Sequence, residues 1–224
     1  MYPARPSILC TPMCSICKQS QGVSRNSHRE DRKIPVTKQG KGININPDSE
    51  KEEFECWADA AFVGVWNRDT AMDDPTTAKS RTGYVINYAG CPLIWSSKLQ
   101  TEIALSTVEA EYIALSQSLR EVISLMQMAK EIKSRKIPLL GNSRSTMKCN
   151  AFEDNTGALE LAKVPKMRPR TKHINIKYHH FRDHIQRGTI QVKHVSTEQQ
   201  IADILTKPLP AALFLKHRQV IMGW

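Results

Sequence analysis

The stretch Ser106–Leu115 constrains the fold of this chain more than any other, because it opens a long predicted helix. Ser106 is a favourable N-cap residue, and Glu109 stands three positions later, which is the spacing of a capping box. Apolar residues then recur at helical spacing as far as Ile132, which indicates a stripe that faces the core. The stretch therefore predicts a helix from Ser106 to about Ser134 with one buried face.

Glu111 lies on this apolar stripe, four residues before Leu115. A carboxylate on an apolar face is costly unless a positive charge or a metal ion meets it. Glu109 has a structural role in the capping box, whereas local structure provides none for Glu111. Taken alone, Glu111 is better explained as a residue at the edge of the stripe that reaches water. A functional role requires other acids to converge on it.

Composition limits the class of protein. The 224 residues include 32 Lys and Arg against 22 Asp and Glu, a net charge of +10, which makes the chain a candidate for binding a polyanion. No apolar run approaches the roughly 20 residues that span a bilayer, and the N-terminus lacks the apolar core of a signal peptide. We therefore expect an intracellular protein, cytoplasmic or nuclear, with no membrane segment. Three of the six cysteines lie in strand-like segments, where buried free thiols are the ordinary interpretation: Cys56, Cys91 and Cys149.

The chain divides into a tail, one domain and a short extension. Residues 1–50 are rich in Ser, Pro, Lys, Arg and Asn without a sustained hydrophobic period, which predicts a poorly structured basic tail or a polyprotein remnant. Residues 51–210 are predicted to form the domain, and residues 211–224 a C-terminal extension with weak signals. Zinc is an alternative for part of the tail, although the spacing fits no standard finger: Cys10, Cys14, Cys17 and His28.

The order of predicted elements indicates an α/β domain. Strands are expected at residues 54–64, 83–88, 92–97, 147–153 and 189–195, and the second and third should form a hairpin. After the long helix, a short helix should begin at Asn155 or Thr156, and others are expected at residues 173–187 and from a second capping box, Thr197 with Gln200, to Pro208. Since helices separate the last two strands, these should run parallel within a mixed sheet.

Four acids stand in elements with apolar neighbours: Asp59, Glu111, Asp154 and Asp203. Clustered carboxylates repel one another unless divalent cations neutralise them, and oxygen-only ligands favour Mg²⁺ or Mn²⁺. Two such ions, ~3.5–4 Å apart, can activate a water and stabilise the leaving oxygen in phosphodiester cleavage. Each acid also has an ordinary explanation by itself: an edge residue for Asp59, a cap for Asp154 and an exposed helix acid for Asp203.

The residues around these acids form a series of short motifs. In chain order they are ADAAFVG (58–64), SRTGYV (80–85), WSSKLQ (95–100), ALSTVEAEYIAL (104–115), EDNTGA (153–158), RTKHI (170–174) and ADILTKPL (202–209). Together, over about residues 54–210, they resemble the ribonuclease H domain of Ty1/copia-type retrotransposon polyproteins. The order of the whole set is specific, whereas any one motif would be modest support.

The resemblance implies a ribonuclease H-like fold, a mixed five-stranded sheet flanked by helices. It also implies an Asp-Glu-Asp-Asp site for two Mg²⁺ or Mn²⁺ ions, onto which Asp59, Glu111, Asp154 and Asp203 map. Some features of this sequence depart from the family. Ala61 replaces a second acid, the Gly-His loop of cellular ribonucleases H is missing before Asp203, and His194 is only a weak substitute for its His. A polymerase domain, which this sequence lacks, is an expected partner.

A basic stretch is the candidate for substrate binding. From Lys163 to Lys193, nine Lys and Arg face one Asp. Phosphate contacts of this kind give affinity without sequence readout, and an RNA–DNA hybrid is recognised by groove shape and 2′-hydroxyls. The alternative is a solvated basic helix. The residues expected to contact nucleic acid are Lys166, Arg168, Arg170, Lys172, His173 and Lys177.

Three functions are compatible with these observations. The favoured one is a divalent-metal-dependent endonuclease that cleaves the RNA strand of RNA–DNA hybrids. The second is a catalytically inert nucleic-acid-binding remnant of a truncated polyprotein, which the unusual first 50 residues make plausible. The third is a structural tether within a polyprotein. Retention of all four acids argues against decay of the site.

Overall fold

A computed structural model describes residues 42–48, 50–63, 75–135, 137, 147–163 and 176–224 of the chain. The three cysteines and the histidine considered above as zinc ligands lie outside these residues, as does nearly all of the predicted tail. No helix in the described ranges has the length and the apolar character needed to cross a membrane.

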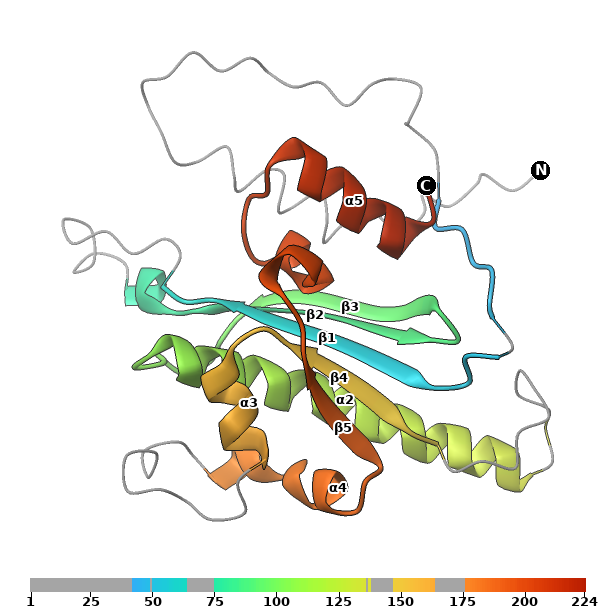
Figure 1. Ribbon diagram of the computed structural model, residues 1–224. Helices are drawn as coiled ribbons and strands as arrows, with labels where there is room; N and C mark the ends of the chain where they lie inside the picture. Colours follow the sequence, from blue (N-terminus) through green and yellow to red (C-terminus); the bar gives the residue numbers. More distant parts are fainter. Residues whose placement is uncertain (1–41, 49, 64–74, 136, 138–146, 164–175) are drawn as a thin grey trace, which may run out of the picture.

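A five-stranded mixed sheet forms the centre of the fold (Figure 1). Its strands lie in the order β3-β2-β1-β4-β5, with β1 antiparallel to β2 and parallel to β4, and β4 parallel to β5. The predicted mixed sheet and the parallel pairing of the last two strands are therefore confirmed. The bounds are Phe54–Ala61 for β1, Arg81–Tyr88 for β2, Cys91–Leu99 for β3, Cys149–Glu153 for β4 and Ile190–His194 for β5.

The predicted hairpin joins β2 to β3 through Ala89 and Gly90. Both residues have positive φ, 51° and 74°, which is the backbone that a two-residue hairpin turn needs to match the strand twist. Glycine adopts this conformation without strain. The turn fixes the register of β2 against β3. The strand β1 lies in the middle of the five-stranded sheet.

The long helix α2 runs from Thr107 to Ser134 and packs along one face of the sheet (Figure 1). Ser106 is its N-cap, and its hydroxyl accepts from the Glu109 N–H at 3.1 Å. The Glu109 carboxylate accepts from the Leu105 N–H at 2.8 Å, one residue before the position that a standard capping box uses. The sequence therefore predicted the start of α2 correctly, with a small change in the second half of the cap.

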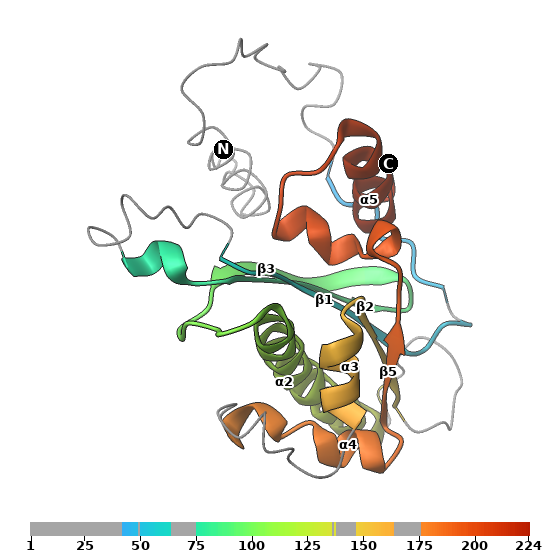
Figure 2. The same cartoon turned by 60° about the vertical axis from the view of Figure 1, so that its left-hand side comes forward.

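Two shorter helices lie on the same side of the sheet as α2: α3, Thr156–Lys163, and α4, Arg182–Gln186 (Figure 2). Asn155 caps α3, because its side-chain oxygen accepts from the Ala158 N–H at 3.1 Å. The continuous helix predicted for residues 173–187 is wrong. The 3-10 helix η5, Ile176–His179, precedes a turn and then α4. The break lets the aromatic rings of both Tyr178 and Phe181 enter the core.

The opposite face of the sheet carries the 3-10 helix η7, Ile201–Leu205, and the helix α5, Ala211–Met222 (Figure 2). They enclose a second, smaller apolar cluster, whose buried members are Val85, Ile201, Ile204, Leu205 and Ile221. Residues 42–48 run past the end of α5, where the Asn44 N–H donates to the Met222 carbonyl at 2.9 Å. Residues 211–224, predicted to be an extension, are thus packed on the sheet.

The helix predicted to open with a Thr197–Gln200 capping box is also wrong. The chain forms two 3-10 helices there, η6, Thr197–Gln199, and then η7. The physical reason is that Thr197 makes a long-range contact instead of a capping contact, whereas Gln200 is itself the N-cap of η7 and accepts from the Ala202 N–H at 3.4 Å. The Thr197 hydroxyl donates to Asp154 at 2.8 Å, and the Gln200 amide donates to the Ala58 carbonyl at 2.7 Å.

Cys56, Cys91 and Cys149 are buried free thiols, as predicted. Burial raises the pKa of the Cys56 thiol to about 12, so it behaves as a small apolar side chain in the core.

Candidate metal centre

Three of the predicted acids meet at the carboxyl ends of the parallel strands. The pairing of β4 with β1 ends at Phe152 and Trp57, so Asp59 extends past β4, and Asp154 follows directly after it. Glu111, in the second turn of α2, approaches from the side of the sheet that α2 covers. One carboxylate oxygen from each of Asp59, Glu111 and Asp154 lies within 4.8 Å of the others.

Glu111 is the most strongly perturbed member of this cluster. Its side chain is only 8% exposed, and its Oε2 has no hydrogen-bond partner among the described residues. Burial, followed by repulsion from Glu153, Asp59 and Asp154, raises the pKa of Glu111 to about 11, although a backbone hydrogen bond from Ala60 opposes the shift. Without a cation Glu111 therefore holds a proton at neutral pH, and a bound divalent ion would restore its charged form.

Asp59 lies at the centre of the site and is 1% exposed. Burial raises its pKa against the opposing effects of Lys207 and of a hydrogen bond from Thr206. The Thr206 hydroxyl donates to Asp59 Oδ2, and the Asp59 Oδ1 lies 3.9 Å from Lys207 Nζ. The carboxylate is thus held from the side of the sheet that η7 covers, opposite to Glu111.

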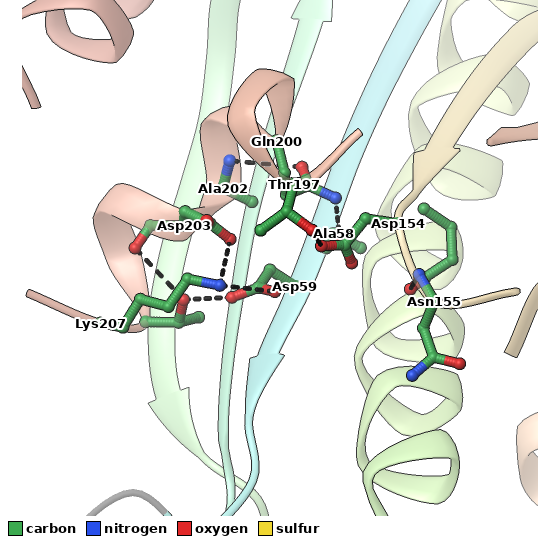
Figure 3. Close-up of polar contacts among 11 residues, drawn as sticks. Ala58, Asp59, Asp154, Asn155, Thr197, Gln200, Ala202, Asp203 and Lys207 are labelled. Carbon is green, nitrogen blue, oxygen red and sulfur yellow. Dashed lines mark hydrogen bonds and ion pairs between the residues drawn. The ribbon is translucent and has the colours of Figure 1, made fainter. Parts of the chain in front are cut away.

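Asp203 lies in η7 and faces Asp59 from that second side (Figure 3). It is 1% exposed and is not one of the three acids whose oxygens all lie within 4.8 Å. Lys207 Nζ lies 2.9 Å from Asp203 Oδ1. Burial and the nearby Asp59 raise the pKa of Asp203 to about 7, although Lys207 opposes the shift. The structure therefore brings the other three predicted acids around Asp59, with an ammonium group between Asp203 and Asp59.

Several contacts fix the η7 segment against the sheet. Gln200 donates to the Ala58 carbonyl at 2.7 Å, and the Ser97 hydroxyl donates to the Leu205 carbonyl at 2.7 Å. Gly83 of β2 lies directly beneath, and a Cβ there would come within 2.5 Å of the Thr206 side chain. Only glycine permits this approach. These contacts hold Asp203 in a constant position relative to β1.

The site also contains two ionisable groups that were not predicted from the sequence, Lys207 and Glu153. Glu153 is fully buried at the end of β4, and burial raises its pKa well above the usual value although the Asn155 N–H donates to its Oε1 at 3.1 Å. Alternate residues of a strand point to the same face, and Glu153 follows the buried Cys149 and Ala151 at this spacing. This spacing is the sequence signal for the inward position of Glu153. For Lys207 the signal was its place four residues after Asp203.

The predicted nucleic-acid contacts fall almost entirely outside the described residues. Lys166, Arg168, Arg170, Lys172 and His173 belong to the segment 164–175, which the structure does not describe. Lys177 lies in η5, but its side chain is also outside the described part. His194 is exposed at the end of β5, opposite Glu153 in the strand register.

The chain matches no protein-family model. The N-terminal ribonuclease H domain of a Mycobacterium tuberculosis protein, solved as a fusion, aligns with 75% of the chain and 96% of that structure, at 14% identity and a TM-score of 0.44.

Sequence similarity is greater to transposon polyproteins. The retrovirus-related Pol polyprotein from transposon TNT 1-94 of Nicotiana tabacum is 34% identical over 164 residues, which are 73% of this chain and 12% of that protein. The corresponding polyprotein from transposon RE1 of Arabidopsis thaliana is 36% identical over 135 residues, 60% of this chain and 9% of that protein. The chain thus spans about a tenth of the length of these relatives. Its homologues are the Pol polyproteins of Ty1/copia-type retrotransposons, as its motifs predicted.

Proposed function

We propose that this chain is a divalent-metal-dependent endonuclease of the ribonuclease H type, which cleaves the RNA strand of RNA–DNA hybrids. The observation that carries the proposal is the convergence of Asp59, Glu111 and Asp154 at the ends of the parallel strands. Glu111 in particular is buried, and its Oε2 has no hydrogen-bond partner in the described part of the chain, which the fold alone does not require. Homology to Ty1/copia-type Pol polyproteins supports the same function. We assign this activity to residues 51–210.

The residues present fit divalent cations of the hard type. The donor set contains carboxylate oxygens and no thiolate or imidazole, which suits Mg²⁺ or Mn²⁺. Asp59, Glu111 and Asp154 would hold one ion, and Asp59 with Asp203 would hold a second. When bound, such a pair of ions supplies an activated water and stabilises the leaving oxygen.

The remaining residues of the site orient these ligands. Thr197 donates to Asp154 Oδ2 and leaves the other oxygen of that carboxylate for a cation. Thr206 and Gln200 fix Asp59 and the η7 segment from the opposite side. Mutation of groups that orient metal ligands in this way typically lowers metal affinity or activity by about 10–100-fold.

We propose that substrate binding uses the basic loop, residues 166–172, together with His173 and Lys177. This segment connects α3 to η5, two elements that lie on the α2 side of the sheet (Figure 2). Its cationic side chains would contact backbone phosphates and release counterions without reading sequence. The polymerase domain of a longer polyprotein is the expected partner in presenting the hybrid.

The test is cleavage of a hybrid with a 5′-labelled RNA strand by the 224-residue chain in Mg²⁺. We expect RNA fragments with the hybrid, none with an RNA duplex and none in EDTA. Asp154→Asn should abolish cleavage. Asp48→Asn makes the same chemical change at an exposed ion pair with Lys51 and should retain cleavage. Hybrid binding without any cleavage by the unaltered chain would instead support the inert nucleic-acid-binding remnant.

A further inference from the structure

Lys207 occupies a position in the site that the ribonuclease H-type chemistry does not itself explain. Its ammonium lies 2.9 Å from Asp203 Oδ1 and 3.9 Å from Asp59 Oδ1 (Figure 3). The side chain of Lys207 is 37% exposed, whereas those of the two aspartates are 1% and 2% exposed. The cation thus enters from the solvent side and ends between two buried carboxylates.

This is the position where a second divalent ion would need its ligands. Asp59 and Asp203 contact the same ammonium, and Asp59 also belongs to the three-carboxylate cluster with Glu111 and Asp154. Two cations held this close by shared carboxylates repel each other, and an ammonium and a metal ion cannot both take the same oxygens. Lys207 and a second ion are therefore mutually exclusive.

Lysine is suited to a reversible occupancy of this kind. Its charge is carried on a flexible four-carbon stem, and it gains much hydration when it leaves a carboxylate. The partial exposure of Lys207 gives the ammonium a path to water while its backbone remains fixed by the hydrogen bond from its own N–H to the Asp203 carbonyl at 3.1 Å.

We propose that Lys207 is an internal counter-ion that holds the position of the second divalent cation in the free protein. The free chain takes one divalent ion, at Asp59, Glu111 and Asp154, and the second enters only when the ammonium moves out to solvent. The inference rests on the proposed function, which supplies the two-ion site. It adds that the chain itself controls when that site becomes complete.

The first experiment counts bound Mn²⁺ without nucleic acid, from the loss of the free-ion electron paramagnetic resonance signal. At the free Mn²⁺ level that just fills one site per wild-type chain, we expect two ions per Lys207→Met chain, because the methionine removes the ammonium and keeps the length of the side chain. Lys207→Arg keeps the charge and should bind one. Lys130→Met is the matched control, since Lys130 is exposed in the distant half of α2, and it should also bind one.

A second experiment follows Lys207 in the wild-type chain and does not depend on the folding of a variant. An amine-reactive reagent labels lysines during a Mg²⁺ titration, and mass spectrometry reads each site. Labelling of Lys207 should stay low while the first ion binds and rise several-fold at higher Mg²⁺, whereas Lys130 should not change. Constant labelling of Lys207 throughout the titration would overturn the proposal.

The outcomes separate this inference from the proposed function. Equal Mn²⁺ stoichiometry and affinity in wild type and Lys207→Met would refute the counter-ion role and leave hybrid cleavage intact. Loss of Mn²⁺ binding in Lys207→Met would also refute it, because the lysine would then support the site and not occupy it. A third outcome is that Lys207→Met binds one more Mn²⁺ than the wild type, while the wild-type chain does not cleave hybrid. That outcome would refute the nuclease function alone.

Discussion

Glutamine in place of Glu111 gives the sharpest test of the metal centre, because Glu109 on the same helix provides a matched control. Both acids are buried to the same extent, 8% exposed. The Glu109 carboxylate accepts from the Leu105 N–H at the start of α2, whereas the Glu111 Oε2 lies near other carboxylates and has no hydrogen-bond partner among the residues that the structure describes. The same substitution at the two positions should therefore have opposite effects.

The size of the Glu111 effect follows from its pKa, which is about 11 in the folded protein against an ordinary value of 4.5. Between these values the unfolded chain has lost the proton and the folded chain has kept it, so the free energy of unfolding falls as pH rises, by ~1.4 kcal/mol per pH unit. At pH 7 the buried Glu111 therefore lowers the free energy of unfolding of the wild type by about 3 kcal/mol. Glu111→Gln removes this cost, but a buried amide without a partner has a cost of its own. We therefore expect the free energy of unfolding to rise by about 1–2 kcal/mol in Glu111→Gln.

Urea unfolding at pH 5, 6 and 7 in EDTA measures this gain. Glu111→Gln should be more stable than wild type at pH 7, with a shallower dependence on pH, whereas Glu109→Gln should lose about 0.5 kcal/mol because glutamine keeps an acceptor oxygen for the cap. In Mg²⁺ the wild type should gain stability by ligand binding, and Glu111→Gln should gain far less.

Hybrid cleavage completes the test. Glu111→Gln should be inactive, and Glu109→Gln should keep most of the wild-type rate. An active Glu111→Gln beside an inactive Glu109→Gln would show that the wrong face of α2 has been assigned to the metal. An unchanged pH dependence of stability in Glu111→Gln would refute the account of its burial.

Three further predictions concern the supports of the site and its substrate. Gly83→Ala should destabilise the domain by about 1–3 kcal/mol and reduce cleavage, because the new Cβ collides with the end of η7 and with Thr206. Gly42→Ala is the control, since nothing lies within 4 Å of the new Cβ there. Equal melting temperatures of the two variants would contradict the prediction. Thr197→Val removes the hydrogen bond to Asp154 and should weaken Mn²⁺ binding by about 10–100-fold, with calorimetry as the measurement. Charge reversal at Arg168, Arg170 and Lys172 should weaken hybrid binding and flatten its salt dependence, and an unchanged slope would exclude the loop from the interface.

Periodic patterns predicted the main elements because they record which face of an element is buried. The long stripe of α2 follows directly from burial on one side, and this helix and all five strands appear close to their expected bounds. The ends of elements were harder to predict where a side chain had a choice of partners. Thr197 satisfied the pattern for a capping box, but its hydroxyl donates to Asp154, which is distant in sequence.

The weak signal of α5 has a related cause. Among its residues only His217 and Ile221 are buried, so it shows no broad apolar stripe, and its position depends on the cluster that η7 presents to it. A helix stabilised by a few contacts to another segment leaves little trace in local periodicity.

The acids of the site were found by combining their apolar surroundings with the family resemblance. Local pattern alone could not show that Asp203 approaches Asp59 from the opposite face of the sheet to Glu111, since this depends on where η7 crosses the strands. For the same reason the role of Lys207 was not predicted. Its spacing from Asp203 is compatible with an ordinary surface ion pair, and only the fold brings its ammonium to the buried Asp59 as well.

The contact between residues 42–48 and the end of α5 determines how this unit would sit in a longer chain. The Trp224 indole N–H donates to the Gly42 carbonyl at 2.7 Å, next to the bond between Asn44 and Met222. The path into β1 and the path out of α5 therefore share one corner (Figure 1). Such a unit could be inserted between two segments of a longer polyprotein, because the folding of the unit would not move those two segments apart. Joining the two ends and opening a surface loop elsewhere should yield a circular permutant that still folds.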